Sequence, residues 1–230
     1  MLSNPNDAGH PLAREISSFI DAVDFPCVGA KAALNRDGMQ FVVARDFRSA
    51  WDDLRILPGL IDLSKRYRAE PKLFQSLVVI FEAGAPANEV DFERLLWDRL
   101  KSLTAKDEWL GQAADARVAH DPEDPHFAMS FGGEAFFVVG LHPAASRPAR
   151  RFAYPAMVFN LHDQFEQLRD QGRYEKLRAT IIGRDVDLAG SVNPMLSPHG
   201  SISSARQYSG RAVGDDWRCP FSGRENRDAA

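Results

Sequence analysis

The order of the apolar segments is the feature that most restricts the fold. Four short apolar or alternating runs, at residues 39–47, 75–84, 135–143 and 156–162, have the length and pattern of β-strands. Helical patterns of unequal length lie between some of them, and strands and helices do not alternate regularly. This order argues against a doubly wound parallel sheet. It predicts a single-domain α+β fold, in which a mixed or antiparallel sheet is flanked by helices.

Amphipathic patterns predict where the helices lie. Residues 11–23 carry apolar side chains at spacings of three and four. A second helical stretch is expected over residues 47–70, with an interruption at Pro58. Asn88 is a good N-cap and should begin the clearest helix. One further helix is predicted over residues 162–181.

The chain of 230 residues is long enough to bury a core without disulfides or metals. We expect one domain over residues 11–221, between a flexible N-terminus of residues 1–10 and a flexible tail of residues 222–230. After Gly183 the periodicity fades, and Gly, Pro, Ser and Asn become frequent while aromatic residues remain. This composition predicts an ordered, loop-rich C-terminal wrap.

Charge and composition argue against several classes of function. The formal net charge is −4 and no dense basic tract is present, so nucleic acid is not expected as a partner. No stretch approaches the roughly 20 apolar residues of a membrane span, and we expect a soluble, cytoplasmic protein. The usual nucleotide-binding motifs are absent. Nothing in the sequence indicates an oligomeric state.

Cys27 is the first candidate for chemistry. Pro26 precedes it and a helix-favouring segment follows, which places the thiol near a helix N-terminus, where unpaired N–H groups stabilise a thiolate. Lys31 lies one turn further on and could add positive charge. The spacing Cys27-x-Gly29-x-x-x-Ala33 also resembles the axial-ligand segment of thiolate-haem monooxygenases. Position alone still favours an inert, buried cysteine, because free cysteines are among the most buried residues.

Three other places carry residues with chemical potential. Cys219 lies in a Cys-Pro pair, where it is either a haem contact or a small apolar residue of a closing loop. His142 ends a predicted strand and could ligate a metal or bind an anion. Arg147, Arg150 and Arg151 follow it and either form a solvated surface or pair with carboxylates, including haem propionates. No histidine or cysteine spacing indicates a zinc or non-haem iron site.

Several motifs along the chain resemble those of one family. They are Phe25-Pro26-Cys27, His142-Pro143 with Ser146-Arg147 and residues 149–152, Asn193-Pro194-Met195-Leu196, residues 205–210, and Cys219-Pro220-Phe221. In this combination, residues 19–221 resemble the YqcI/YcgG family. Characterised members are haem-dependent enzymes that N-hydroxylate guanidine or related nitrogen groups, including an arginine hydroxylase of antibiotic biosynthesis and the pre-guanitoxin hydroxylase. The resemblance implies haem b and a monooxygenase that N-hydroxylates a guanidine or amine of a small molecule.

The resemblance also changes how the candidate ligands are ranked. A thiolate ligand pushes electron density onto haem iron and favours O–O cleavage, so Cys27 becomes the first choice. His142 is the competing ligand and Cys219 comes third. In relatives we expect an acidic residue before Ala-Arg-Gln-Tyr, where Ser203 and Ser204 stand here. A carboxylate that would reach a cationic substrate is therefore missing from this position.

The resemblance implies roles for further residues. The haem propionates would be bound by Arg147, Arg150 and Arg151. Tyr208 and Asn193 could donate hydrogen bonds beside the haem, and Glu166 or Asp185 could bind a cationic substrate. Because no flavin or nicotinamide motif is visible, electrons would come from a separate reductase or ferredoxin. The alternative function is a haem-binding sensor or carrier that does not turn over a substrate.

Overall fold

The computed structural model describes residues 6–196 and 200–221, and its centre is a five-stranded mixed sheet. The strands, in the order β1-β2-β5-β4-β3, are β1 Met39–Asp46, β2 Ser76–Ala83, β5 Ala156–Leu161, β4 Glu134–Leu141 and β3 Met129–Phe131. β1 and β2 are parallel, whereas the other neighbouring strands are antiparallel. The predicted α+β fold with a mixed sheet is confirmed.

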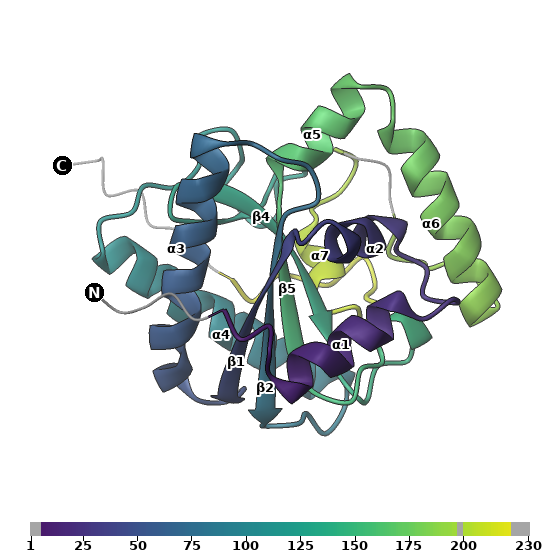
Figure 1. Ribbon diagram of the computed structural model, residues 1–230, viewed down its shortest axis with the longest axis horizontal. Helices are drawn as coiled ribbons and strands as arrows, with labels where there is room; N and C mark the ends of the chain where they lie inside the picture. The colour runs from purple at the N-terminus through teal and green to yellow at the C-terminus, as the bar shows by residue number, and fades with distance from the viewer. Residues whose placement is uncertain (1–5, 197–199, 222–230) are drawn as a thin grey trace.

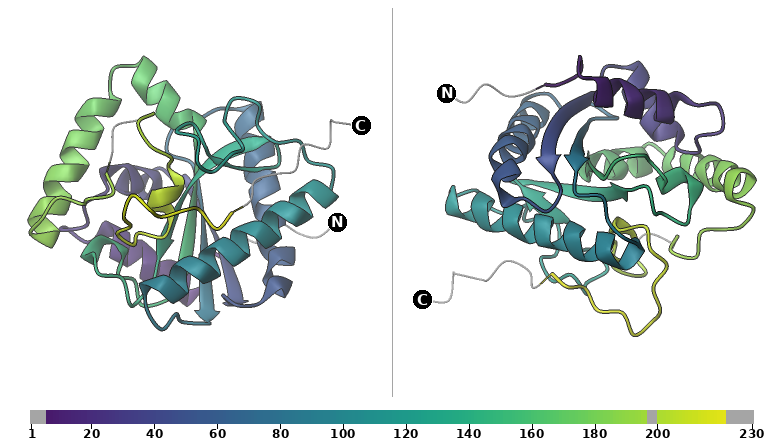
Figure 2. Two further views of the ribbon diagram at one scale, coloured as in Figure 1. Left: turned by 180° about the vertical axis from the view of Figure 1, so that it is seen from behind. Right: turned by 90° about the horizontal axis from the view of Figure 1, so that it is seen from below.

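Helices cover both faces of this sheet (Figures 1 and 2). They are α1 Pro11–Asp21, α2 Val28–Asn35, α3 Asp53–Ala69, α4 Glu89–Trp109, α5 Asp163–Asp170, α6 Tyr174–Ala189 and α7 Ala205–Tyr208, with short 3-10 turns η1 Ala50–Asp52 and η2 Pro148–Arg150. α1 and α2 lie on one face, and α3 and α4 lie on the other. α5 and α6 stand to the side of the sheet, near α2.

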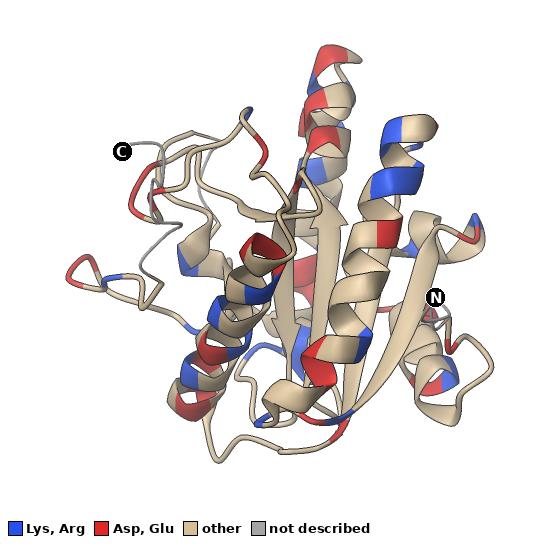
Figure 3. Ribbon diagram, turned by 90° about the vertical axis from the view of Figure 1, so that its left-hand side faces the viewer, with Lys and Arg blue, Asp and Glu red and all other residues tan. Residues whose placement is uncertain are grey.

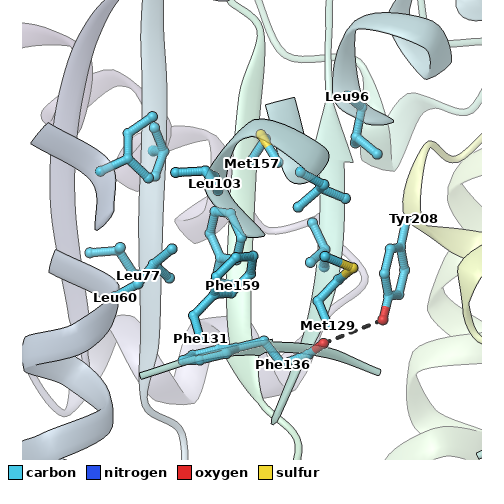
Figure 4. Close-up of a cluster of buried hydrophobic side chains, with 14 of the residues drawn as sticks. Leu60, Leu77, Leu96, Leu103, Met129, Phe131, Phe136, Met157, Phe159 and Tyr208 are labelled. Carbon is cyan, nitrogen blue, oxygen red and sulfur yellow. Dashed lines mark hydrogen bonds between the residues drawn. The ribbon is translucent and has the colours of Figure 1, made fainter. Parts of the chain in front are cut away.

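Side chains of the strands alternate between two apolar cores. Val42, Val79 and Phe159 point to the α3 and α4 side, where they pack with leucines of those helices (Figure 4). Their neighbours Val43 and Val78 point to the other side and pack with α1 and α2. This period of two follows from the pleat of a strand. Both faces of the sheet are therefore buried, which explains why the strands read as nearly continuous apolar runs.

Two predicted helix boundaries were wrong. The expected interruption at Pro58 does not occur, because α3 runs through it from Asp53 to Ala69. Proline removes one helix hydrogen bond, and burial of Leu57 and Leu60 on either side keeps the segment helical. The helix predicted over residues 162–181 divides at Gly172, whose φ of 65° lies in the left-handed region.

Other element boundaries also differ from the expectation. α6 extends to Ala189, beyond the point where the periodicity fades, and the short strand β3 is not among the four strands predicted from the sequence. The N-cap at Asn88 is confirmed, since its side chain accepts the Asp91 N–H at 2.9 Å.

The N-terminal segment covers the free edge of β1. The Asp7 N–H donates to the Phe41 carbonyl at 2.9 Å, and the Asp7 carboxylate accepts the Val43 N–H at 2.7 Å. The Asn6 side chain accepts the Phe41 N–H at 3.4 Å, and Arg55 pairs with Asp7 at 3.3 Å. Asn6 and Asp7 thus behave as part of the sheet, although residues 1–10 were expected to be flexible. Residues 1–5 and the expected tail, 222–230, lie outside the described residues.

The C-terminal wrap covers the edge of β4 beyond the short strand β3. Arg150 donates to the Gly140 carbonyl of β4 at 2.9 Å and to the Gln207 and Tyr208 carbonyls of α7 at 3.2 and 3.3 Å. The Tyr208 hydroxyl donates to the Phe136 carbonyl at 3.3 Å (Figure 4). Gly140 lies beyond the residues of β4 that pair with β3, so its bond to Arg150 satisfies a carbonyl on the open edge, whereas Phe136 also pairs with Met129 of β3.

The outer surface of α3 and α4 carries charges of both signs. Acidic and basic residues are interspersed along α4, whereas α3 ends in a basic group, Lys65, Arg66 and Arg68 (Figure 3). Within residues 6–196 and 200–221, no helix has the length and apolar character needed to cross a membrane.

Two glycine substitutions test the packing of the fold. At Gly140 an added Cβ would lie 2.5 Å from the Phe92 ring and 2.8 Å from Leu96. Phe92 is fully buried and stacked on its neighbours, so it has no room to move. We expect Gly140→Ala to lower the free energy of unfolding by about 1–3 kcal/mol, measured by urea denaturation.

Gly183→Ala is the matched control, because no atom lies within 4 Å of its added Cβ and the site is inside α6. Here alanine should raise the free energy of unfolding by about 0.5–1 kcal/mol through helix propensity. Equal stabilities of the two variants would contradict the packing at β4.

Candidate functional site

Cys27 is the N-cap of α2, as the sequence predicts. Its half-buried Sγ accepts the Ala30 N–H at 3.4 Å, and the Gly29 N–H points at it from the same helical turn. Pro26 is buried directly before it, and the helix then begins at Val28. The local sequence therefore directs the sulfur at the unpaired N–H groups of a helix start.

Burial raises the pKa of the Cys27 thiol above its ordinary value, and the Ala30 and Gly29 N–H groups and Arg150 offset part of this rise. The thiol is therefore protonated at neutral pH even with Arg150 nearby. The Lys31 ammonium, expected to act on the sulfur, instead lies at the end of α1, where it donates to the Asp21 carbonyl at 3.0 Å and to the Ala22 carbonyl. Arg150 is the cation that acts on Cys27.

Arg147 and Asp185 join η2 to α6 beside this site. The Arg147 guanidinium donates to the Asp185 carboxylate at 2.6 Å and to the Ser191 carbonyl at 3.0 Å. Asp185 is 7% exposed and is the one residue of α6 that is fully buried. Burial lowers the pKa of Arg150 to about 10, although the charges of Asp185 and Cys27 act to raise it. The charges of both the cysteine and the buried carboxylate thus act on Arg150.

Arg184 belongs to the same site but was not found from the sequence. It lies on α6 and donates to the Val23 carbonyl and, at 3.1 Å, to the Phe25 carbonyl, two residues before Cys27. An arginine inside an amphipathic helix ordinarily lies in solvent, so the sequence carries no signal for this contact. The Nε atoms of Arg184 and Arg147 are buried without a hydrogen-bond partner. Two guanidinium groups near Cys27 therefore have unused donors.

Several apolar side chains of α6 and β4 are only half-buried, although apolar residues of helices and interior strands usually pack inside the core. α6 carries Leu177, Ile181, Ile182, Val186 and Leu188, all of them only half-buried. On β4, the interior strand residues Phe137 and Val139 are also half-buried, and Phe165 of α5 meets Phe137 edge-on at 6.2 Å. Cys27, Val139 and Leu177 pack at the rim of one core cluster. A half-exposed apolar lining of this kind is typical of a ligand-binding site.

The residue types around Cys27 are those that a haem site uses. They are a half-buried cysteine, half-buried apolar side chains, and the Arg147 and Arg184 guanidinium groups, which suit carboxylates. A surface hollow of about 180 Å³ lies elsewhere, next to Phe47 and Arg99, and contains none of the candidate residues. In the described parts of the chain, no three His, Cys, Asp or Glu residues are grouped to hold a metal ion.

The competing ligands lie away from Cys27. His142 is 1% exposed and stacks on Phe92 at 4.0 Å, on the α4 side of the sheet. Cys219 packs against the core on that same side, and its N–H donates to Glu123 at 3.0 Å. Burial raises the pKa of the Cys219 thiol to about 12. The structure therefore does not bring the three candidate ligands together.

The remaining predicted site residues have structural contacts. Tyr208 is fully buried and stacks with Trp97, and Arg151 donates to the Ala145 carbonyl at 2.8 Å. Asn193 accepts the Met195 N–H at 3.0 Å, and Glu166 pairs with Arg169 on α5. These contacts place Tyr208 in the α4-side core and Glu166 within a helix-surface ion pair.

The burial of His142 predicts a dependence of stability on pH. Burial, assisted by Arg150, lowers the pKa of His142 from 6.5 to about 4, although Glu89 acts to raise it. Between these pH values the unfolded chain binds a proton that the folded protein excludes. From pH 7 to pH 4, the free energy of unfolding should therefore fall by about 3 kcal/mol more in the wild type than in His142→Gln.

Urea denaturation of both proteins at several pH values measures this difference. The comparison cancels the carboxylates that titrate in both proteins. Parallel curves of stability against pH would show that His142 does not titrate in this way.

Similarity to a known protein family extends over most of the chain. The model of the YqcI/YcgG family matches residues 16–222. No curated protein matches the chain, and no solved structure matches it. The matched region includes both cysteines, His142 and every arginine of the site. The chain belongs to the YqcI/YcgG family.

Proposed function

We propose that this protein is a haem-dependent monooxygenase that N-hydroxylates a guanidine or amine nitrogen of a small molecule, with Cys27 as the iron ligand. The observation that carries the proposal is the position of the Cys27 sulfur. It is half-buried, faces the N–H groups of a helix start and lies next to Arg150 and the half-exposed apolar side chains of β4 and α6. His142 and Cys219 lack this combination, because both pack in the core on the α4 side.

The residues around Cys27 have distinct roles in this proposal. A haem with a thiolate ligand supplies oxygen activation when it is bound. The Ala30 N–H and Arg150 stabilise the negative charge of the sulfur, a charge that burial alone would disfavour. Arg147 and Arg184 would bind the propionates with their unused Nε donors. The apolar side chains of α6 and β4 would exclude water from the reacting nitrogen.

A cationic substrate needs a carboxylate close to the haem. Of the two candidates, Asp185 lies with the arginines near Cys27, whereas Glu166 is bound by Arg169 on α5. We therefore favour Asp185 over Glu166 for this role. Electrons would come from a separate reductase or ferredoxin, which remains part of the proposal.

The absorption spectrum of the reduced, CO-bound protein tests the ligand. The wild type should show the Soret band typical of thiolate haem, and Cys27→Ala should lose it because no other thiol reaches the site. Cys219→Ala is the matched control and should keep the band. Loss of the band in Cys219→Ala alone would move the ligand to the C-terminal wrap, and a histidine-type band in the wild type would favour His142.

Oxygen consumption tests the activity. The haem-loaded protein, supplied with reductant and a panel of guanidines and amines, should consume oxygen faster with its substrate than without, and Cys27→Ala should lose this stimulation. A coloured protein that none of the compounds stimulates would favour a haem sensor or carrier. A colourless protein, purified from cells given a haem precursor, would contradict the proposal as a whole.

A further inference from the structure

The loop that leads into Cys27 is held from outside by two cations. Lys31 binds the Asp21 and Ala22 carbonyls at the end of α1, and Arg184 binds the Val23 and Phe25 carbonyls. Four of the five carbonyls from residue 21 to residue 25 therefore accept from a charged side chain. Charge-assisted bonds of this kind are stronger than bonds between neutral groups.

The two cations differ in where they come from. Lys31 lies on α2, four residues after Cys27, so its bonds join α1 to the helix that Cys27 caps. Arg184 comes from α6, more than 150 residues further along the chain. Val23 is 90% exposed, so the loop gains little from packing at this point, whereas Phe25 is buried against Phe19. Arg184 is therefore the polar contact that adds to the packing of Phe25 and ties the exposed part of the loop to α6.

α6 is itself fixed by the residue next to Arg184. Asp185 pairs with Arg147 of η2 at 2.6 Å, and the apolar side chains of α6 are only half-buried. Besides the packing of Tyr174 and Leu177, two adjacent polar residues hold α6: Asp185 joins it to η2, and Arg184 joins it to the Cys27 loop.

We infer that Arg184 is a positioning residue for Cys27: by binding the Val23 and Phe25 carbonyls it holds the sulfur against the start of α2 and at a fixed place relative to α6. Its meaning for catalysis rests on the proposed function, in which this sulfur binds iron. The positioning itself is a property of the protein without haem, so it can be tested separately.

The rate at which iodoacetamide alkylates Cys27, measured against pH in a Cys219→Ser background, reports on the position of the sulfur. Arg184→Gln removes the cation that holds the loop, so water reaches the sulfur and the pKa of Cys27 falls toward its ordinary value. At pH 8 we expect alkylation about fivefold to tenfold faster than with Arg184 present, because losing a charge-assisted hydrogen bond lets the loop open more often. Arg184→Lys keeps the charge and should stay within about twofold of the parent rate.

Two further variants separate positioning from general destabilisation. Arg178→Gln removes another half-buried arginine of α6 and should leave the alkylation rate unchanged. Leu103→Ala weakens the distant core by leaving a cavity and should also leave the rate nearly unchanged. The inference is overturned if Arg184→Gln matches the parent rate, or if Leu103→Ala accelerates alkylation as much as Arg184→Gln does.

A second measurement applies if the protein binds haem. Arg184→Gln should lower the fraction of CO-bound haem that shows the thiolate-type band, and Arg184→Lys should restore it. An unchanged fraction in Arg184→Gln would overturn the positioning role in the loaded protein. A protein that binds no haem would defeat the proposed function, while the alkylation rates would still decide the positioning of Cys27.

Discussion

The guanidinium of Arg150 is the contact on which the site depends. It binds one carbonyl of β4 and two of α7, so it fastens the C-terminal wrap to the edge of the sheet. The backbone carbonyl of Arg150 accepts the His142 N–H, and this bond fixes the turn that follows β4. The same guanidinium acts on the charge of Cys27. Sheet edge, wrap and cysteine therefore meet at one buried cation.

Cations at this end of the molecule are paired mainly with carbonyls. Arg150, Arg151, Arg184 and Lys31 all donate to backbone oxygens, whereas Arg117 and Arg211 elsewhere bind carboxylates. A carbonyl satisfies the hydrogen-bonding need of a guanidinium without cancelling its charge. Arg150 keeps its charge next to Cys27 in this way, in a chain whose formal net charge is −4, and it offsets part of the rise in the pKa of the Cys27 thiol that burial causes.

Local patterns in the sequence were enough for four of the five strands, the Asn88 cap and the helix start at Cys27, because each depends on neighbouring residues. The division at Gly172 and the continuity through Pro58 were missed, since a left-handed glycine and the burial around a helix proline are settled by tertiary packing. The site was predicted only in part. Cys27, Arg147 and Arg150 were identified, but the contact of Arg184 joins segments more than 150 residues apart, and no local pattern reports such a pair.

The cover over β1 matters to anyone who shortens this chain. The first helix begins at Pro11, which makes that residue an inviting place to cut. A cut there would remove Asn6 and Asp7 and leave the N–H groups of Phe41 and Val43 open on a flat, apolar strand. Such an edge pairs readily with the same edge of a second molecule. If a shortened protein associates or precipitates, the cause would then be the missing Asn6 and Asp7. The intact chain would not be expected to behave in this way.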